Sequence, residues 1–448
     1  MISSPGLLLG ADESIETLKR ELRELRERTG QLERKLQALE DAPAAAPSPA
    51  PPPDPVRAWS PADPIQLGSS PKYINVSLSV LGAAGGSTAE DVAALQPGGH
   101  DPRQRGFTLQ NAELTLQGAI DPYLRGQAST IFFIDPDGET VIELEEAFLE
   151  SLSLPWNLQA KAGQFLTEFG RINASHPHTW DFVDSPLVNA RYFGEDGLRG
   201  PGARLSWLVP TPFYSELFFA VQNSHGETAH SFRSDHEDEP YFGRPASVDR
   251  LHSAADLLFV PRYAASFDLT EAQTLLAGLS AAFGPNSSGA ESHTQIYGAD
   301  IFWKWKALNH EGGFPFVTWQ TEALLRRFEA GEFDGDPADP AVLPLPAETL
   351  EDWGFYSQIA YGFRRGWVAA LRGDYVAPLD RSDYELLLGP DLDRASRWRL
   401  SPNLTWYPSE FSKIRLQYNF DRRNQIGDDH SVWLQFEFLL GSHAAHKF

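Results

Sequence analysis

The sequence predicts an all-β protein: a transmembrane antiparallel β-barrel of about sixteen strands, preceded by an N-terminal α-helical coiled coil. Three observations predict this fold. Apolar and polar residues alternate along many short segments, and short and long connections between these segments follow one another in turn. In addition, no apolar run is long enough to form a transmembrane helix.

The alternation is clearest near the end of the chain. In Ser431–Leu440, SVWLQFEFLL, every second residue is apolar, and Lys413–Phe420 repeats the pattern. Side chains of a strand point to opposite faces in turn, so each segment has one apolar and one mostly polar face. Many such strands with charges on the polar face indicate a barrel that has lipid outside and water inside.

The same reasoning predicts sixteen strands from Lys72 onward: 72–82, 107–120, 123–134, 140–154, 157–166, 202–209, 213–223, 254–267, 272–283, 294–307, 316–328, 353–363, 367–377, 396–407, 411–420 and 431–440. Every second connection is short, as at 121–122, 155–156 and 364–366, and most of the others are long. Short periplasmic turns and long outer loops are typical of outer-membrane barrels, whereas a soluble β-sandwich has no reason for such parity. The parity places both termini on the periplasmic side.

A helix is predicted before the barrel. Ile15–Leu39 carries apolar residues at alternating spacings of three and four, which indicates a periplasmic coiled coil within residues 1–41. The alternative is a single amphipathic helix, and the seam does not fix the number of strands in the coil. Residues 42–71 are rich in Pro and Ala and predict a semi-rigid linker, followed by the barrel at 72–448.

Composition excludes several functions. The net charge of −24 argues against nucleic acid as a partner, and the absence of Cys excludes disulfides and thiol chemistry. No spacing singles out a catalytic Ser/His/Asp set, so we expect neither an enzyme nor a cofactor. Met1–Ala11 lacks the basic start and the apolar length of a secretory signal, so we expect the natural start to differ.

The polar faces predict a charged pore wall. If the face of each strand opposite its apolar face points inward, more bases than acids point into the barrel. Arg397, Arg399, Lys413 and Arg415 then form a ladder on two adjacent strands, and such a ladder needs water or anions between its members. Alternatively, these charges only solvate the interior. The full inward set comprises the bases Arg125, Lys161, Arg204, Arg262, Lys304, Lys306, Arg372, Arg397, Arg399, Lys413 and Arg415, and the acids Glu113, Asp300, Glu322, Asp374 and Glu437, with Glu143 and Glu145 at its margin.

The remaining acids lie in loops, so a mildly basic wall is expected below an acidic mouth. One connection, Thr167–Pro201, is unusually aromatic for an outer loop and should therefore fold into the lumen and narrow it. Its polar residues are the candidate constriction: Arg171, His176, His178, Asp181, Asp184 and Arg191. His176 and His178, with Asp181 and Asp184 near in sequence, favour structural hydrogen bonding over the weaker alternative of a metal site.

A family resemblance adds to this interpretation. The run Glu146–Gly170, EAFLESLSLPWNLQAKAGQFLTEFG, resembles bacterial outer-membrane porins of the phosphate-selective type, as does a heptad helix ahead of a barrel. The resemblance implies a trimeric sixteen-strand channel whose third outer loop folds inward. Phosphate selectivity in that family depends on dense basic ladders, whereas here bases alternate with acids, so that specificity is not implied. The final residue is Phe448, as in most outer-membrane barrels.

We therefore expect an outer-membrane porin that passes small hydrophilic solutes or ions. The alternative is a structural barrel that anchors or sheaths a partner protein. A siderophore receptor would need about 22 strands and a plug domain. Most residues before Lys72 are predicted to form the coiled coil and the Pro-rich linker, so they do not predict a plug domain. Expected partners are outer-membrane lipid, two further copies of the chain through the barrel wall and the coiled coil, and periplasm or cell wall through the N-terminal helix.

Overall fold

In the computed structural model the chain divides into two compact units, residues 1–59 and 60–448. The structure describes residues 26–31, 65–69, 72–119, 121–226, 228–234, 240–246, 251–336, 339 and 342–441. Residues 26–31 are helical. The rest of the predicted coiled coil and most of the predicted linker lie outside the described residues, so both stay predictions.

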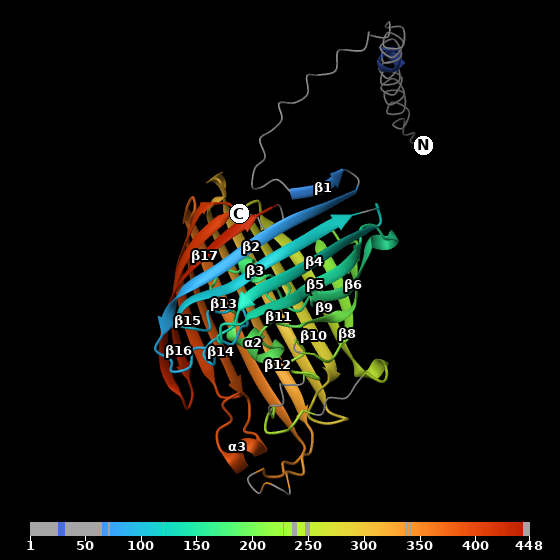
Figure 1. Cartoon of the computed structure of the whole chain (residues 1–448). Coiled ribbons are helices and arrows are strands. Elements are labelled where there is room, and N and C mark those ends of the chain that lie inside the picture. The colour runs from blue at the N-terminus through green and yellow to red at the C-terminus, as the bar shows by residue number, and fades with distance from the viewer. Residues whose placement is uncertain are drawn as a thin grey trace, which may run out of the picture. The chain divides into compact units, whose positions relative to one another are not determined.

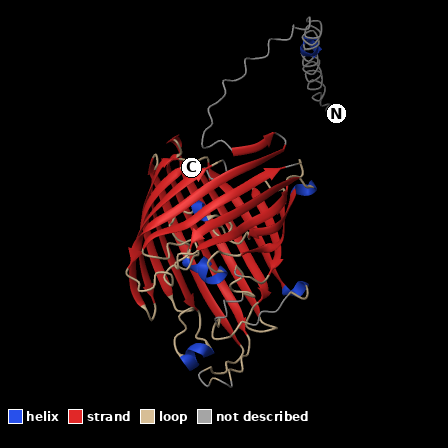
Figure 2. Ribbon diagram, in the orientation of Figure 1, coloured by secondary structure: helices blue, strands red, loops and turns tan. Residues whose placement is uncertain are grey.

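Sixteen antiparallel strands, β2 to β17, close into a barrel (Figures 1 and 2). Each strand pairs with its neighbours in sequence, and β17 returns to β2 with pairs from Ser431↔Ser87 to Leu440↔Leu78. The predicted number of strands is confirmed. Their bounds are β2 Lys72–Ser87, β3 Gly106–Ala119, β4 Leu124–Ile134, β5 Thr140–Ser151, β6 Leu158–Leu166, β7 Arg199–Leu208, β8 Tyr214–Asn223, β9 Leu257–Thr270, β10 Gln273–Pro285, β11 His293–Glu311, β12 Phe314–Ala330, β13 Glu348–Arg364, β14 Trp367–Pro378, β15 Arg397–Ser409, β16 Ser412–Arg423 and β17 Gly427–Leu440.

One further strand, β1 (Ile65–Ser69), lies where the sequence predicts linker. It pairs with β2 from Ile65↔Val76 to Ser69↔Lys72. The pairing of β17 along β2 ends at Leu78, and β3 occupies the other edge of β2. β1 therefore satisfies the backbone groups of β2 that β17 leaves open, and the strand pairing begins earlier than the predicted boundary at residue 72.

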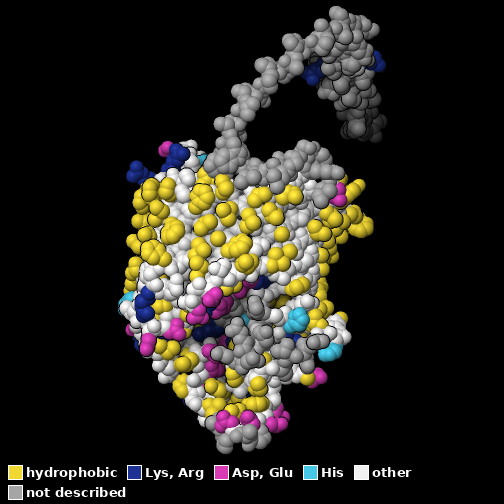
Figure 3. All heavy atoms as spheres, in the orientation of Figure 1, with side chains coloured by type: hydrophobic (Ala, Val, Ile, Leu, Met, Phe, Trp, Pro, Cys, Tyr) yellow, Lys and Arg dark blue, Asp and Glu magenta, His cyan; other side chains and the backbone are white. Residues whose placement is uncertain are grey.

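The two faces of the wall differ as the alternation predicts. In residues 431–439 of β17 the exposed side chains are Val432, Leu434, Phe436 and Phe438, each about half exposed, whereas the intervening residues are buried. Figure 3 shows apolar side chains spread over the wall, with charged ones gathered mainly toward the end that carries α3. An apolar exterior around a polar interior is the wall that a bilayer requires.

The helices are short: η1 (Pro155–Asn157), η2 (Pro177–Thr179), α2 (Leu187–Phe193), η4 (Ala254–Asp256) and α3 (Asp383–Leu388). Among the described residues, no helix is both long and apolar enough to cross a membrane. Long connections follow β2, β6, β8, β12 and β14, and short turns follow β3, β7, β9, β11, β13 and β15, as predicted. α3 belongs to the long-loop end, and α2 lies within the barrel (Figure 1).

Candidate functional site

The segment between β6 and β7, residues 167–198, lies inside the barrel; we refer to it as the inward segment. Its turns follow from local sequence. Gly170 adopts a φ of 58°, which favours glycine, and a Cβ there would lie 1.9 Å from Oε2 of Glu322 and displace that carboxylate. α2 begins after Pro186 and ends at Gly194, whose φ is 88° and whose N–H donates to the carbonyl of Ala190.

Apolar side chains hold the inward segment against the wall. Leu187, Val188, Tyr192 and Phe193 of α2 form one buried cluster with Phe169 and with residues of the surrounding strands. α2 contacts β12, β13 and β14. Burial of the aromatic residues of this segment explains why their number is high for a connection between strands. The predicted inward fold of this segment agrees with these contacts.

Asp184 is the main polar attachment of the inward segment. Its Oδ1 accepts hydrogen bonds from Arg372 (2.6 Å) and Gln417 (3.0 Å), and its Oδ2 accepts from Arg399 (3.0 Å) and Asn419 (2.6 Å). All five side chains are buried. Burial alone raises the pKa of Asp184, but Arg372 and Arg399 outweigh it and hold that pKa below its usual value. We call these five residues the arginine anchor.

The predicted basic ladder points inward, and it bonds to protein groups. Arg397 and Arg399 both donate to Asp421. Lys413 pairs with Glu437 (2.5 Å) and donates to the carbonyl of His178 (2.7 Å). Arg415 donates to Gln435 and to the carbonyl of Trp180. The predicted water or anions between these charges are thus replaced by acids and loop carbonyls, because buried like charges need compensation.

Asp421 is not among the inward acids predicted from the sequence. It continues the inward face of β16 two residues after Asn419, and extending that strand beyond residue 420 would have found it.

Most of the other predicted wall residues are also engaged. Arg262 binds Asp300 through two hydrogen bonds (2.5 and 3.1 Å), and Arg372 binds Asp374. Glu322 accepts hydrogen bonds from Tyr356 and from the N–H of Ile172 in the inward segment. Nearer the short turns, the ion pairs are Arg125–Glu150, Lys161–Glu168, Arg204–Glu150 and Arg204–Glu168. Whether any of these groups lines the solute path stays a prediction.

One basic region of the lumen has less compensation. Arg171 stacks on the ring of Phe302, 3.9 Å from guanidinium carbon to ring centroid, and donates to Gln320. Lys304 follows Phe302 on the same face of β11 and is partly exposed. Within the described part of the chain no acid pairs with Lys304. Lys306 lies two residues further along this face. We call Arg171 and Lys304 the basic face.

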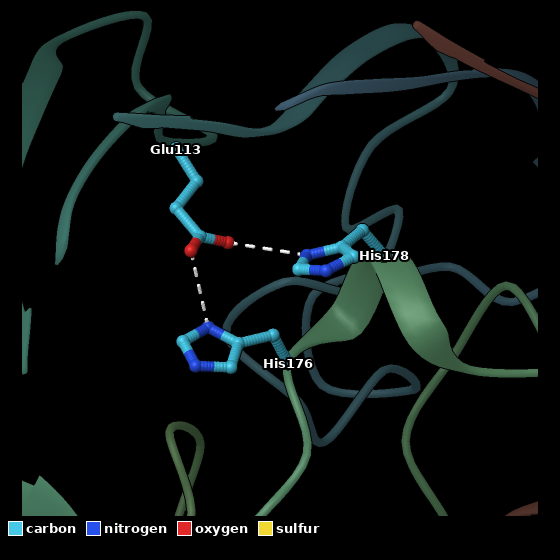
Figure 4. Close-up of side chains that lie close together, drawn as sticks. All are labelled: Glu113, His176 and His178. Atoms are coloured by element: carbon cyan, nitrogen blue, oxygen red, sulfur yellow. Dashed lines mark hydrogen bonds and ion pairs between the residues drawn. The ribbon is translucent and has the colours of Figure 1, made fainter. Parts of the chain in front are cut away.

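The two histidines of the inward segment meet three glutamates of the wall, and Figure 4 shows the histidines with one of these, Glu113. His176 directly precedes η2 and His178 lies within it, and each Nδ1 faces Glu113 of β3: His176 at 3.3 Å and His178 at 3.2 Å. His176 Nδ1 is also 2.8 Å from Glu145, and its Nε2 is 3.2 Å from Glu146, both of β5. We call these five residues the histidine cluster.

The acids at the histidines are therefore not those that the sequence suggested. Asp184 belongs to the arginine anchor, and Asp181 lies near the amide of Gln358, 3.4 Å away. Proximity in sequence misled the prediction, because η2 turns the histidines toward β3 and β5 while the following residues run toward β14–β16. Burial alone lowers the pKa of His176, but Glu145 and Glu113 hold it well above its usual value.

A cavity of about 850 Å³ lies between α2 and the long loops, and Leu187, Ala190 and Arg191 of α2 form part of its lining. Arg191, the remaining predicted constriction residue, lines it and donates to the carbonyls of Arg394 and Ala395. Basic and acidic side chains both border this cavity, among them Arg103, Arg397, Glu195 and Asp393. The mouth is thus mixed in charge at its inner surface.

No protein-family model matches the chain. An uncharacterized protein of Aquifex aeolicus is 32% identical over 374 residues, which cover 78% of this chain and 73% of that protein. The chain belongs to the same family as that protein.

Among solved structures, the outer membrane channel DcaP of Acinetobacter baumannii superposes with a TM-score of 0.52 at 12% identity, covering 82% of this chain and 97% of that one. An anion-selective porin of Comamonas acidovorans gives a TM-score of 0.49 at 8% identity, covering 82% of this chain and all of that one. The first likeness shows that the chain has the barrel fold of a porin. The resemblance to phosphate-selective porins stays a prediction.

Proposed function

We propose that this protein is a porin of the bacterial outer membrane, a passive diffusion channel for small hydrophilic solutes or ions in which the inward segment forms the constriction. One observation carries the proposal: the inward segment is bonded to opposite parts of the inner wall. Asp184 binds β14, β15 and β16, His178 faces β3, and the Ile172 N–H donates to β12. A segment attached on several sides reduces the cross-section of the lumen permanently.

The path that we propose for solutes begins in the cavity between α2 and the long loops, where both signs of charge are present. It continues past the basic face. The predicted ladder contributes little to selectivity in this proposal because each base is compensated. Lys304 and Arg171 instead act on ions that pass, since fixed charges in a narrow aqueous pore are only partly screened. We therefore expect a weak preference for anions.

The alternative, a barrel that sheaths a partner protein, needs an open interior. The apolar cluster formed by α2 and Phe169 occupies the interior where such a partner would pass. We also propose that the chain forms homotrimers through the barrel wall and the N-terminal helix, which the family resemblance implies. The native mass of the full-length protein in detergent tests this, and the mass of a single barrel would contradict it.

The channel function is tested with purified protein in planar bilayers and in proteoliposomes. We expect ohmic conductance steps that scale with salt concentration, together with liposome swelling in small sugars but not in large ones. Reversal potentials in a salt gradient should favour anions slightly. Folded protein, verified by its β-sheet circular dichroism, that inserts but gives neither conductance nor swelling would contradict the proposal.

A further inference from the structure

The histidine cluster has more acid than base. Glu113, Glu145 and Glu146 are each less than 10% exposed, and two imidazoles cannot neutralise three carboxylates even when both are protonated. The bases on nearby strands are paired with other acids: Lys161 and Arg204 with Glu168, Arg125 with Glu150, and Arg199 with Glu143. Uncompensated charge of this kind inside a protein is unfavourable unless a cation accompanies it or a proton neutralises it.

The backbone of β5 is shaped so that two consecutive acids enter the cluster. Consecutive residues of a regular strand point to opposite faces. Here Leu144 pairs with Thr130 and Glu146 with Ser129, so Glu145 is an extra residue without a partner in β4. This bulge lets both Glu145 and Glu146 be buried on the inner side. Bulges beside functional sites commonly re-aim a side chain in this way.

The hydrogen bonds around His176 resemble those of a metal ligand. Its Nδ1 faces Glu113 and Glu145, while its Nε2 faces Glu146. Glu146 is itself held by the N–H of Leu166 (3.0 Å) and the amide of Gln127 (3.1 Å). A metal-binding histidine usually donates its second N–H to a carboxylate, which fixes the tautomer and the orientation of the ring.

We propose that Glu113, Glu145, His176 and His178 bind one divalent transition-metal ion, with Zn²⁺ the best match, and that Glu146 orients His176. Ligand atoms of Glu113 and the two histidines lie within 4.8 Å of one another. The two contacts between Glu113 and the imidazoles, 3.3 and 3.2 Å, match the edge of a tetrahedron around Zn²⁺, about 3.3 Å for bonds of about 2.0 Å, and Glu145 lies 2.8 Å from His176 Nδ1. The proposal goes beyond the channel function and does not depend on it.

The donor set decides the class of ion. Two imidazoles with carboxylates suit Zn²⁺, Co²⁺ and Ni²⁺, whereas Ca²⁺ and Mg²⁺ prefer oxygen ligands alone. Because Glu113 and Glu145 belong to β3 and β5 while both histidines belong to the inward segment, the bound ion joins the segment to the wall. A second cluster, His100, Glu143 and Asp196, is a poorer candidate because Arg199 already neutralises Glu143.

The test is titration of the chelator-treated, full-length protein in detergent with Zn²⁺ by calorimetry, with bound metal counted by elemental analysis. We expect one Zn²⁺ per chain that millimolar Mg²⁺ or Ca²⁺ does not displace. Substitution of Co²⁺ should give the intense visible absorption of a tetrahedral site. His178→Gln and Glu145→Gln should weaken Zn²⁺ binding at least about 100-fold, and Glu146→Gln about 10- to 100-fold.

His100→Gln is the matched control and should bind Zn²⁺ as the wild type does. Circular dichroism and heat-dependent gel migration verify that each variant forms the barrel, and Glu145→Gln, at a bulge, provides a second variant should a histidine change disturb folding. Wild-type protein without a stoichiometric Zn²⁺ site would overturn the proposal. Equal affinity in His178→Gln, Glu145→Gln and the wild type would do so as well, as would loss of binding in His100→Gln alone.

Discussion

Two of the attachments of the inward segment to the wall use opposite arrangements of charge. At the arginine anchor one carboxylate, Asp184, receives two guanidinium groups and two amides, and all are buried. At the histidine cluster two imidazoles meet three carboxylates. Arginine stays charged at any physiological pH, whereas histidine titrates near neutrality. The first attachment is therefore permanent, and the second responds to protons and, in our proposal, to metal.

Removing the charge of Asp184 should have the largest effect. In Asp184→Asn the guanidinium groups of Arg372 and Arg399 keep their burial and lose a shared counter-charge, which costs about 3–5 kcal/mol for a buried pair. We expect an inward segment that detaches, seen as larger and noisier single-channel conductance and lower thermal stability.

Asp181→Asn is the matched control for this variant, because among the described residues the side chain of Asp181 makes one hydrogen bond, a 3.4 Å contact with Gln358. Its conductance should equal that of the wild type. If Asp184→Asn and Asp181→Asn behave alike, the arginine anchor does not hold the segment.

The histidine cluster should make attachment depend on pH. The pKa of His176 is raised in the folded protein, so the protonated form favours the attached segment. That stabilisation is complete below the ordinary pKa of about 6.5 and is lost as pH rises through the raised value. We expect conductance noise in chelator-containing buffer to increase with pH, and His176→Gln to abolish this part of the dependence.

Asp101, which accepts a hydrogen bond from the N–H of Ser185 beside the anchor, should act in the same direction over a lower range. Burial and then the charge of Asp184 raise its pKa to about 7. Its protonated form is favoured in the folded protein, so its contribution is complete below about 4 and is lost as pH rises to about 7. Asp101→Asn should flatten the pH profile in that window, and an unchanged profile would exclude this role.

The smallest effect should come from the basic face. Lys304→Gln removes a partly exposed charge that no described acid pairs, so reversal potentials in a salt gradient should shift toward cations by a few millivolts while the conductance stays nearly constant. Arg415→Gln, by contrast, removes a buried group that binds Gln435 and Trp180. It should disturb the segment rather than selectivity. A larger selectivity shift in Arg415→Gln would favour the ladder as the ion path.

The strands could be predicted from sequence because alternation is local. The apolar residues from Val432 to Phe438 can be recognised as one face of a strand without knowing the fold. The inward fold of residues 167–198 could be predicted because this connection contains many aromatic residues, which would stay exposed to water in an outer loop and are buried when the segment folds into the lumen. The partners of Asp184 could not, since Arg399 lies more than two hundred residues away and the pairing depends on strand register. Glu145 was marginal in the alternation because it sits in a bulge, which period-two reasoning cannot place.

The constriction itself is tested most directly by single-channel conductance after deletion of residues 175–189, which removes η2, both histidines and Asp184. The matched control is deletion of residues 382–389 around α3, in the long connection between β14 and β15, where Leu386 and Leu387 are exposed. We predict a clear increase in conductance for the first deletion and none for the second. An unchanged conductance in the first variant, with the barrel folded, would contradict the account, because a segment that fills part of the lumen cannot be removed without widening the water path.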